Sequence, residues 1–236
     1  MAEPILTVSG LVAGYGRISA IKHIDFQAYN GEIVGVVGPN GAGKTTLLET
    51  IAGTIDPKAG QIAYLGNRID RLSVMARRKM GILLVPQDSY LFPVMSVKKN
   101  LDISGLLNTK VENKKFLEYV HDLFPILKER KKQIASTLSG GEQKTLAVGM
   151  GIIANAKVML IDEPSIGLAP KLVTKLFENL RQLKEDTGKA LVLAEQNVKV
   201  LDIADRVFGL EAGEIQFSSK TADLGEEVVK ELFLGK

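Results

Sequence analysis

A glycine-rich stretch near the start of the chain fits the phosphate-binding pattern G-x-x-x-x-G-K-[ST]. It consists of Gly38, Pro39, Asn40, Gly41, Ala42, Gly43, Lys44, Thr45 and Thr46. Glycines let the backbone curl so that successive N–H groups point at phosphate oxygens, and a following helix adds its positive amino-terminal end. Lys44 supplies a cation for the β- and γ-phosphates, and the Thr45 hydroxyl can bind Mg²⁺. The stretch therefore predicts a phosphate-binding loop.

Two carboxylates, Asp162 and Glu163, close the apolar run from Val158 to Ile161. The carboxyl end of a buried parallel strand is where ligands bind in open α/β sheets. Neighbouring side chains of a strand point to opposite faces, so one acid can face a metal while the next faces elsewhere. We expect Asp162 to bind Mg²⁺, directly or through water, and Glu163 to act as general base for an attacking water.

A second glycine turn lies at Leu138 to Gln143, between the phosphate loop and Asp162. Ser139 stands where it can cap a helix that begins after it. Taken alone, this turn is as consistent with a capped surface helix as with a ligand site.

The composition excludes several kinds of site. The chain has 236 residues, of which 45% are hydrophobic and 24% charged, with no cysteine and two histidines. The lack of cysteine excludes disulfides, thiolate metal sites and cysteine nucleophiles. His23 and His121 are too few for a multi-histidine metal site. The longest uncharged run, Pro4 to Gly16, is 13 residues long, short of the roughly 20 that a membrane-spanning helix needs.

Two further observations concern location and partners. The first residues lack the basic and apolar regions of a signal peptide, so a cytoplasmic location is expected. A net charge of +3 is too weak to indicate nucleic acid. The basic runs Arg77 to Lys79 and Lys128 to Lys132 favour solvated helix faces over sites for RNA or lipid headgroups.

Strands and helices alternate along the predicted chain, which implies a parallel sheet covered on both faces. Strands are expected at 5–8, 24–28, 32–37, 158–161 and 190–194, and a short strand pair near 61–64 and 81–85 flanks a helical stretch at 72–79. A further helix is expected at 172–184. Apolar residues at spacings of three and four predict helices from about 89 to 154. We predict one domain over residues 1–236, with a catalytic core (1–88 and 155–236) and an inserted helical subdomain (89–154).

The order of the phosphate loop, the Ser-Gly-Gly-Glu-Gln turn and the Asp-Glu pair resembles the nucleotide-binding subunit of an ATP-binding cassette (ABC) transporter, over nearly the whole chain. The resemblance implies an α/β fold of the P-loop NTPase type. Its core sheet would be mixed or parallel, with an antiparallel β element on the amino-terminal side and an inserted α-helical subdomain. The implied ligands are ATP and Mg²⁺, and the implied activity is ATP hydrolysis coupled to membrane transport.

In such proteins two nucleotides lie at the interface of a head-to-tail dimer, and the glycine turn of one subunit closes over the γ-phosphate held by the other. The resemblance therefore assigns a nucleotide contact in trans to Ser139, Gly140, Gly141 and Glu142.

Three more residues take roles from the resemblance. Tyr15 matches an aromatic residue that stacks on adenine. Gln87 matches a glutamine that binds Mg²⁺ and the attacking water and links them to the helical subdomain. Gln196 stands where most of the family has a histidine that contacts the γ-phosphate.

The chain departs from the wider family at three positions. Besides Gln196, Ala169 replaces a usual aspartate and Met150 replaces a usual arginine. Glu-Gln-Asn at 195–197 and Gly-Leu-Ala-Pro at 167–170 resemble the cassette ATPases of branched-chain amino-acid uptake systems, and the segment Glu231 to Gly235 fits the same group. The effects of Ala169 and Met150 stay open.

The resemblance also implies partners. These are transmembrane permease subunits and a second ABC ATPase subunit, which is identical or paralogous. No nucleic acid is expected as a partner. The resemblance implies a peripheral location on the inner face of the cell membrane. The segment Asp88 to Ser96 would accept a cytoplasmic helix of the permease. Its residues Tyr90, Leu91, Phe92 and Val94 suit such a contact, although burial within the helical subdomain is as compatible with the pattern.

The expected function is ATP-driven import of branched-chain or other hydrophobic amino acids. One alternative is the ATPase subunit of a lipid or lipopolysaccharide exporter. The other is a soluble ABC ATPase of DNA repair or translation, although those usually carry two cassettes or a long coiled-coil insertion. The sequence leaves the transported substrate, the direction of transport and the identity of the second ATPase subunit open.

Overall fold

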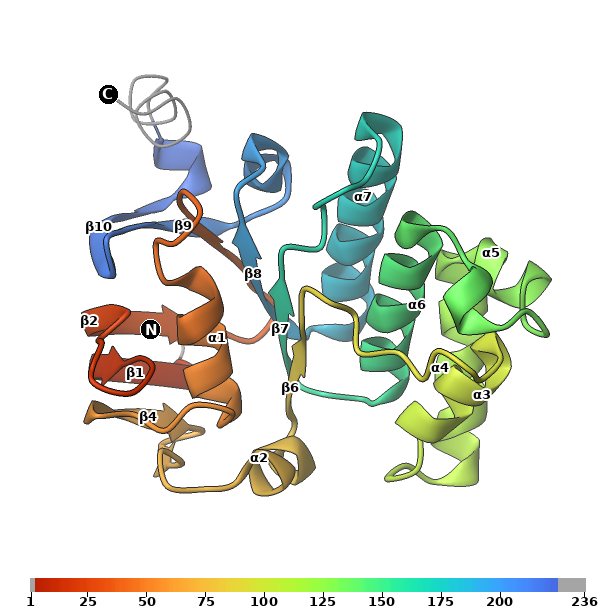
Figure 1. The fold of residues 1–236 in the computed structure, drawn as a ribbon, viewed down its shortest axis with the longest axis horizontal. Coiled ribbons are helices and arrows are strands. Elements are labelled where there is room, and N and C mark those ends of the chain that lie inside the picture. The colour runs from red at the N-terminus through yellow and green to blue at the C-terminus, as the bar shows by residue number, and fades with distance from the viewer. Residues whose placement is uncertain (1–2, 225–236) are drawn as a thin grey trace.

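The computed structural model describes residues 3–224, which form two β-sheets with helices packed around them (Figure 1). A four-stranded antiparallel sheet has the order β2-β1-β4-β5, and a six-stranded sheet has the order β10-β9-β3-β8-β7-β6. The first contains β1 (Leu6–Ala13), β2 (Ile21–Ala28), β4 (Ala59–Tyr64) and β5 (Asn67–Arg68). The second contains β3 (Ile33–Val37), β6 (Ile82–Val85), β7 (Val158–Asp162), β8 (Ala190–Glu195), β9 (Arg206–Glu211) and β10 (Glu214–Lys220).

The six-stranded sheet is parallel except at one edge. Strands β9, β3, β8, β7 and β6 run parallel, and β10 pairs antiparallel with β9. Both faces of this sheet are covered, because alternate residues of β7 and β8 belong to two separate apolar clusters. The predicted α/β fold class, with an antiparallel β element and a largely parallel core sheet, is confirmed.

Helix α1 (Lys44–Ala52) lies between the two sheets and contacts β1, β6, β7 and β8. On the other face pack α6 (Gly140–Ile153) and α7 (Pro170–Thr187), as Figure 1 shows. The remaining helices are α2 (Val74–Met80), α3 (Val97–Ser104), α4 (Lys110–Leu123) and α5 (Pro125–Glu129), with short 3₁₀ helices at Ala135–Thr137, Val198–Asp202 and Thr221–Asp223. No helix within residues 3–224 has the length and apolar character needed to cross a membrane.

Glycines let α6 approach its neighbours closely. A Cβ atom on Gly149 would lie 3.0 Å from Leu127 Cδ1 of α5, and one on Gly151 would lie 2.8 Å from Met159 Cε of β7. Contacts this short leave little room for a side chain. Helix α6 is therefore held firmly between the other helices and the parallel sheet, which fixes the position of the turn that precedes it.

The two short strands predicted near 61–64 and 81–85, and the helix between them, are confirmed as β4, β6 and α2. The first strand is β4 of the antiparallel sheet, whereas the second is β6 at the edge of the parallel sheet. Helix α2 separates the two strands and carries the chain from one sheet to the other. Strand patterns show that a segment is extended, but they do not show which sheet it joins.

The basic run Arg77 to Lys79 was expected to form a solvated helix face. This expectation is wrong for Arg77, whose side chain is 1% exposed. Its Nη1 donates to the carbonyls of Thr50 and Ile51 at 2.7 and 2.8 Å, and its Nη2 donates to Asp70 O at 3.0 Å. The last carbonyls of a helix lack partners within that helix. The Arg77 guanidinium therefore closes the carboxyl end of α1 and joins it to α2.

Replacing Arg77 by methionine should lower the free energy of unfolding by about 3 kcal/mol, because three buried carbonyls each lose the hydrogen bond from the guanidinium. Urea unfolding of the full chain, followed by circular dichroism, measures this change. The exposed neighbour Lys79 is the matched control, since Lys79→Met should change stability by less than about 0.5 kcal/mol. Equal midpoints for the two variants would contradict the role given to Arg77.

Candidate active site

The predicted phosphate loop connects β3 to α1, in the order strand, loop, helix. Gly41 and Gly43 adopt φ of 77° and 107°, which disfavour other residues. A Cβ atom on Gly38 would lie 2.1 Å from Leu210 O. Within residues 3–224, no side chain caps the amino terminus of α1. Its first N–H groups can therefore bind an anion.

Lys44 is buried and folds back over its own loop. Its ammonium donates to the carbonyls of Gly38 and Pro39 at 2.9 and 3.0 Å and lies 3.3 Å from Glu163 Oε1. The two side chains of this ion pair are 4% and 10% exposed. The structure thus brings together the cation of the phosphate loop and the second carboxylate after β7.

Asp162 is the last residue of β7 and has the same phase as Val158 and Leu160, which pack on the α1 face of the sheet. Its side chain is buried, and its Oδ1 has no hydrogen-bond partner among the described residues. Burial raises the pKa of Asp162, and a hydrogen bond with Thr45 opposes this rise. An unpartnered buried carboxylate oxygen is unfavourable.

The hydroxyl of Thr45 and the carboxylate of Asp162 are the hard oxygen ligands that Mg²⁺ prefers. No group of three or more His, Cys, Asp or Glu residues in the described part of the chain could hold a metal ion by itself. Mg²⁺ usually combines one or two protein ligands with substrate phosphates and water. The residues therefore fit a cation that arrives together with a phosphate ligand.

Glu163 follows β7 in a strained backbone conformation, with φ of 42°. Its N–H donates to Ala194 O of β8 at 2.9 Å. Positive φ is uncommon for residues other than glycine, and such strain gathers at functional sites. Here it turns Glu163 toward Lys44, so the adjacent acids Asp162 and Glu163 have different surroundings.

Glu195, which sequence reasoning did not single out, joins two loops at this edge of the sheet. It is 2% exposed and accepts hydrogen bonds from Ser165 N and Oγ at 2.9 and 2.8 Å, and from the N–H groups of Gln196 and Asn197 at 3.2 Å. Burial raises its pKa, while these hydrogen bonds oppose the rise. The sequence could have indicated its burial, because the alternation along the strand places Glu195 on the same face as the buried Leu191 and Leu193. Gln196 itself is exposed beside this carboxylate.

Ser139 caps α6 as its residue type predicts. Its Oγ accepts from Glu142 N at 3.3 Å, and Glu142 Oε2 accepts from Ser139 N at 2.8 Å. These hydrogen bonds lower the pKa of Glu142. Ser139 and Gly140 are exposed. Helices α1 and α6 pack on opposite faces of the parallel sheet, so the structure does not bring the glycine turn onto the phosphate loop of the same chain.

Tyr15 lies in the turn after β1 and is 58% exposed. Its hydroxyl donates to Glu49 Oε2 on α1 at 2.8 Å. Burial, together with this hydrogen bond, raises the pKa of the Tyr15 hydroxyl. The ring is thus tied to the helix that follows the phosphate loop.

Gln87 lies two residues after β6 and is half-buried. Its carbonyl accepts a hydrogen bond from Lys144 Nζ at 2.6 Å, and the same ammonium lies 3.2 Å from Glu163 O. Lys144 was missed by sequence reasoning, because nothing in the spacing of α6 distinguishes it from a solvated lysine. One side chain of α6 therefore links the segments that carry Gln87 and Glu163.

Comparisons with known proteins show the family of the chain. A family described as "ABC transporter" matches residues 21–166. The "High-affinity branched-chain amino acid transport ATP-binding protein BraG" of Pseudomonas aeruginosa is 38% identical, over 94% of this chain and 95% of that protein. The "Probable branched-chain amino acid transport ATP-binding protein LivF" of Archaeoglobus fulgidus is 35% identical, over 95% and 96%. The solved structure of cbiO1 from Clostridium perfringens, part of the transporter complex cbiONQ, has a TM-score of 0.83 at 25% identity and covers 99% of this chain and 96% of its own.

One further solved structure is relevant to assembly. It is a dimeric post-hydrolysis state of the ATP-binding cassette MJ0796 bound to ADP and Pi, with a TM-score of 0.82 and 23% identity. The match covers 92% of this chain and 98% of that one, and at this identity it shows likeness of fold.

Asp162→Asn should stabilise the chain by about 1 kcal/mol at pH 7 without Mg²⁺ or nucleotide, because it removes a desolvated charge. The pKa of Asp162 is raised by folding, so the folded state binds the proton more tightly. The destabilising contribution is absent below the ordinary pKa of aspartate, grows as the pH rises from that value to the raised folded pKa, and is constant above it. The stability gap between variant and wild type should therefore widen from about pH 4 upward.

Urea unfolding at a series of pH values in EDTA measures this gap. The exposed Asp122 of α4 offers the control, since Asp122→Asn should produce no comparable gap. A variant less stable than wild type at pH 7 would refute the account of Asp162.

Proposed function

The chain belongs to the ABC transporter family, and from this membership we propose that it drives the import of branched-chain or other hydrophobic amino acids. Its place as an ATP-hydrolysing subunit of an ABC transporter follows from the family and from the named relatives. The substrate class rests on what those relatives transport. The observation that carries the mechanism is the buried ion pair between Lys44 and Glu163.

We infer that Lys44 and the loop N–H groups of residues 38–46 hold the β- and γ-phosphates of ATP. Those phosphates would offer the Lys44 ammonium a second anionic partner in competition with Glu163. The Glu163 carboxylate would then be available to accept a proton from the attacking water. Such a switch couples the arrival of the substrate to activation of the base.

Thr45, Asp162 and Gln87 are proposed to hold Mg²⁺, which would neutralise charge on the phosphate oxygens. The unpartnered Oδ1 of Asp162 supports this assignment. Gln196 is proposed as a γ-phosphate contact through its amide, which can donate a hydrogen bond but carries no charge. Its exposure beside Glu195 is compatible with that contact. Tyr15 is proposed to stack on adenine.

We propose that Ser139, Gly140, Gly141 and Glu142 act on the nucleotide of a second ATPase subunit in a head-to-tail dimer. Two features support this: Ser139 and Gly140 are exposed and Gly141 and Glu142 are half-buried, and their helix lies on the opposite face of the sheet from α1. The Glu142 carboxylate already accepts a hydrogen bond from Ser139 N in the helix cap. Its contribution would therefore be to stabilise the conformation of the turn. The second subunit can be identical or paralogous.

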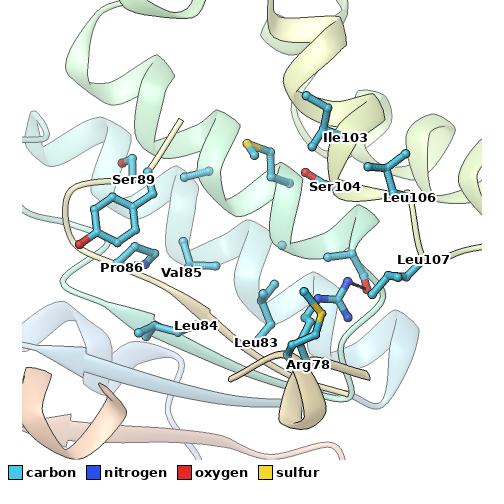
Figure 2. A pocket seen from close by; sticks show the side chains of 16 residues that line it. Arg78, Leu83, Leu84, Val85, Pro86, Ser89, Ile103, Ser104, Leu106 and Leu107 are labelled. Carbon is cyan, nitrogen blue, oxygen red and sulfur yellow. Dashed lines mark hydrogen bonds between the residues drawn. The ribbon is translucent and has the colours of Figure 1, made fainter. Parts of the chain in front are cut away.

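We propose that a groove between β6 and the two helices α3 and α6 binds a segment of the permease. This contact would hold the chain at the inner face of the membrane. Figure 2 shows Leu84 and Val85 of β6 on one side, and Ile103, Leu106 and Leu107 across from them. The cavity measures about 410 Å³, and Met150 also lines it. Methionine in place of arginine makes this lining more apolar.

The segment after Gln87 supports the same assignment. Tyr90, Phe92 and Val94 are exposed, whereas Leu91 is half-buried. Exposed apolar side chains next to an apolar groove are typical of a protein interface. Ser89 and Tyr90 have φ of 63° and 29°, so the backbone is strained where the groove meets the segment of Gln87.

Glu163→Gln should lower the rate of ATP hydrolysis at least about 100-fold, because the amide cannot accept the proton of water. ATP binding should survive, and dimers should accumulate with ATP. Phosphate release, calorimetric ATP titration and size-exclusion chromatography measure these three effects. The exposed Glu118 provides a control, since Glu118→Gln should hydrolyse ATP normally. A full rate in Glu163→Gln would exclude Glu163 as the base.

Leu106→Glu should abolish co-purification of the permease subunits while ATP hydrolysis by the free chain stays within about twofold, because the charge is placed in an apolar interface. To test this, the tagged chain is purified from detergent-solubilised membranes, and the proteins that co-purify with it are identified by mass spectrometry. Val111→Glu is the matched control, because Val111 is 79% exposed on α4 and does not line the groove. Recovery of ribosomes or DNA with the wild-type chain would refute the transporter assignment.

A further inference from the structure

Lys144 occupies an unusual position for a lysine of the second turn of a helix. The residue is half-buried, and its ammonium donates to two main-chain carbonyls, Gln87 O at 2.6 Å and Glu163 O at 3.2 Å. The two acceptors come from different strands of the parallel sheet, since Gln87 follows β6 and Glu163 follows β7. Three separate segments therefore meet at one side chain.

Burial of this ammonium is unfavourable in itself and lowers the pKa of Lys144. The surrounding carboxylates of Asp88, Asp162, Glu163 and Glu195 oppose that effect. Two of them, Asp162 and Glu195, are almost fully buried at the ends of β7 and β8. The positive charge is thus retained by the negative field of the site.

The Glu163 peptide needs such support because its backbone is strained, with φ of 42°. A residue in this conformation persists only when its surroundings hold it there. Its N–H is fixed by Ala194 O at 2.9 Å, and its carbonyl is reached by Lys144. The base is therefore held on one side by β8 and on the other by α6.

Helix α6 is the element that begins at the Ser139 cap, and it is packed tightly through Gly149 and Gly151. A movement of its amino-terminal end would move Lys144, and with it the carbonyls of Gln87 and Glu163. A short shift of a catalytic group is sufficient to change a rate strongly. The bridge thus offers a direct physical route from the glycine turn to the general base of the same subunit.

We propose that Lys144 is a positioning residue for ATP hydrolysis, which ties the start of α6 to Gln87 and Glu163 and holds the base where it can activate water. This role rests on the proposed function of Glu163. It differs from the role of Lys44, because Lys144 acts through main-chain carbonyls of the protein.

The first test is Lys144→Met in the full chain, which keeps the length of the side chain but removes its donors. We expect kcat for ATP to fall about 10-fold or more, with KM changed less than twofold, because the base is misplaced while the phosphate loop is intact. Lys144→Arg should recover most of the rate, since the guanidinium can donate to both carbonyls. The exposed Lys115 of α4 is the control, and Lys115→Met should retain the wild-type kcat.

A structural role alone would give a different pattern. If Lys144 only stabilised the fold, its variants would lose activity in proportion to the decrease in their melting temperature. In that case, Lys144→Arg and Lys144→Met of equal stability would have the same kcat. Lys144→Gln, which retains a donor, serves where Lys144→Met does not fold. An unchanged kcat in folded Lys144→Met, or a loss confined to KM, would overturn the proposal. A wild-type chain without any ATP hydrolysis would instead overturn the proposed function.

A second test asks whether the effect passes through the base. In the Glu163→Gln background, Lys144→Met should reduce the residual hydrolysis by a smaller factor than it does in wild type, because the group that it positions is already disabled. An equal reduction in both backgrounds would overturn the assignment.

Discussion

The alternation of side chains along buried parallel strands decides which polar groups of this chain lie on the same face of the sheet. Asp162 continues the phase of Val158 and Leu160 and faces α1, whereas Glu195 continues the phase of Leu191 and Leu193 and faces away from it. These strands are neighbours, with Asp162 opposite Ala194. One register shift would exchange the two faces. The hydrophobic packing of both faces therefore also fixes the chemistry at the carboxyl edge of the sheet.

Charge is distributed unevenly at this edge, and that asymmetry gives the two adjacent acids separate properties. Glu163 pairs with Lys44 at 3.3 Å, while an oxygen of Asp162 lacks a partner among the described residues. Breaking a buried ion pair leaves an uncompensated charge, so Lys44 and Glu163 hold each other until another charged group competes. Asp162, in contrast, leaves its Oδ1 without a partner among the described residues, and a cation is the proposed ligand of that oxygen. The ligand-free site is thus prepared for an anion and a cation together.

Sequence could predict the groups whose chemistry is local. The loop from Gly38 to Thr46 and the Asp162–Glu163 pair are contiguous, and their flanking strand and helix patterns are strong. Lys144, Glu195 and Arg77 could not be assigned in the same way, because their partners lie far along the chain: Arg77, for example, binds carbonyls 26 and 27 residues away. A basic run cannot reveal that one member is buried until the packing is known. The strands at β4 and β6 could be predicted, but their membership of two different sheets could not, for the same reason.

The proposed phosphate loop and the glycine turn belong to opposite faces of one sheet. The phosphate loop faces α1, and the glycine turn begins α6 on the other side. In the proposed head-to-tail dimer, a nucleotide would contact both because a second subunit supplies one of them. Within one chain, α6 contacts the carboxyl edge of the sheet at Lys144, which is the proposed route between the two. The groove that Met150 and Val85 line also lies between α6 and β6. A partner bound there would therefore contact the same helix that reaches the Glu163 carbonyl through Lys144.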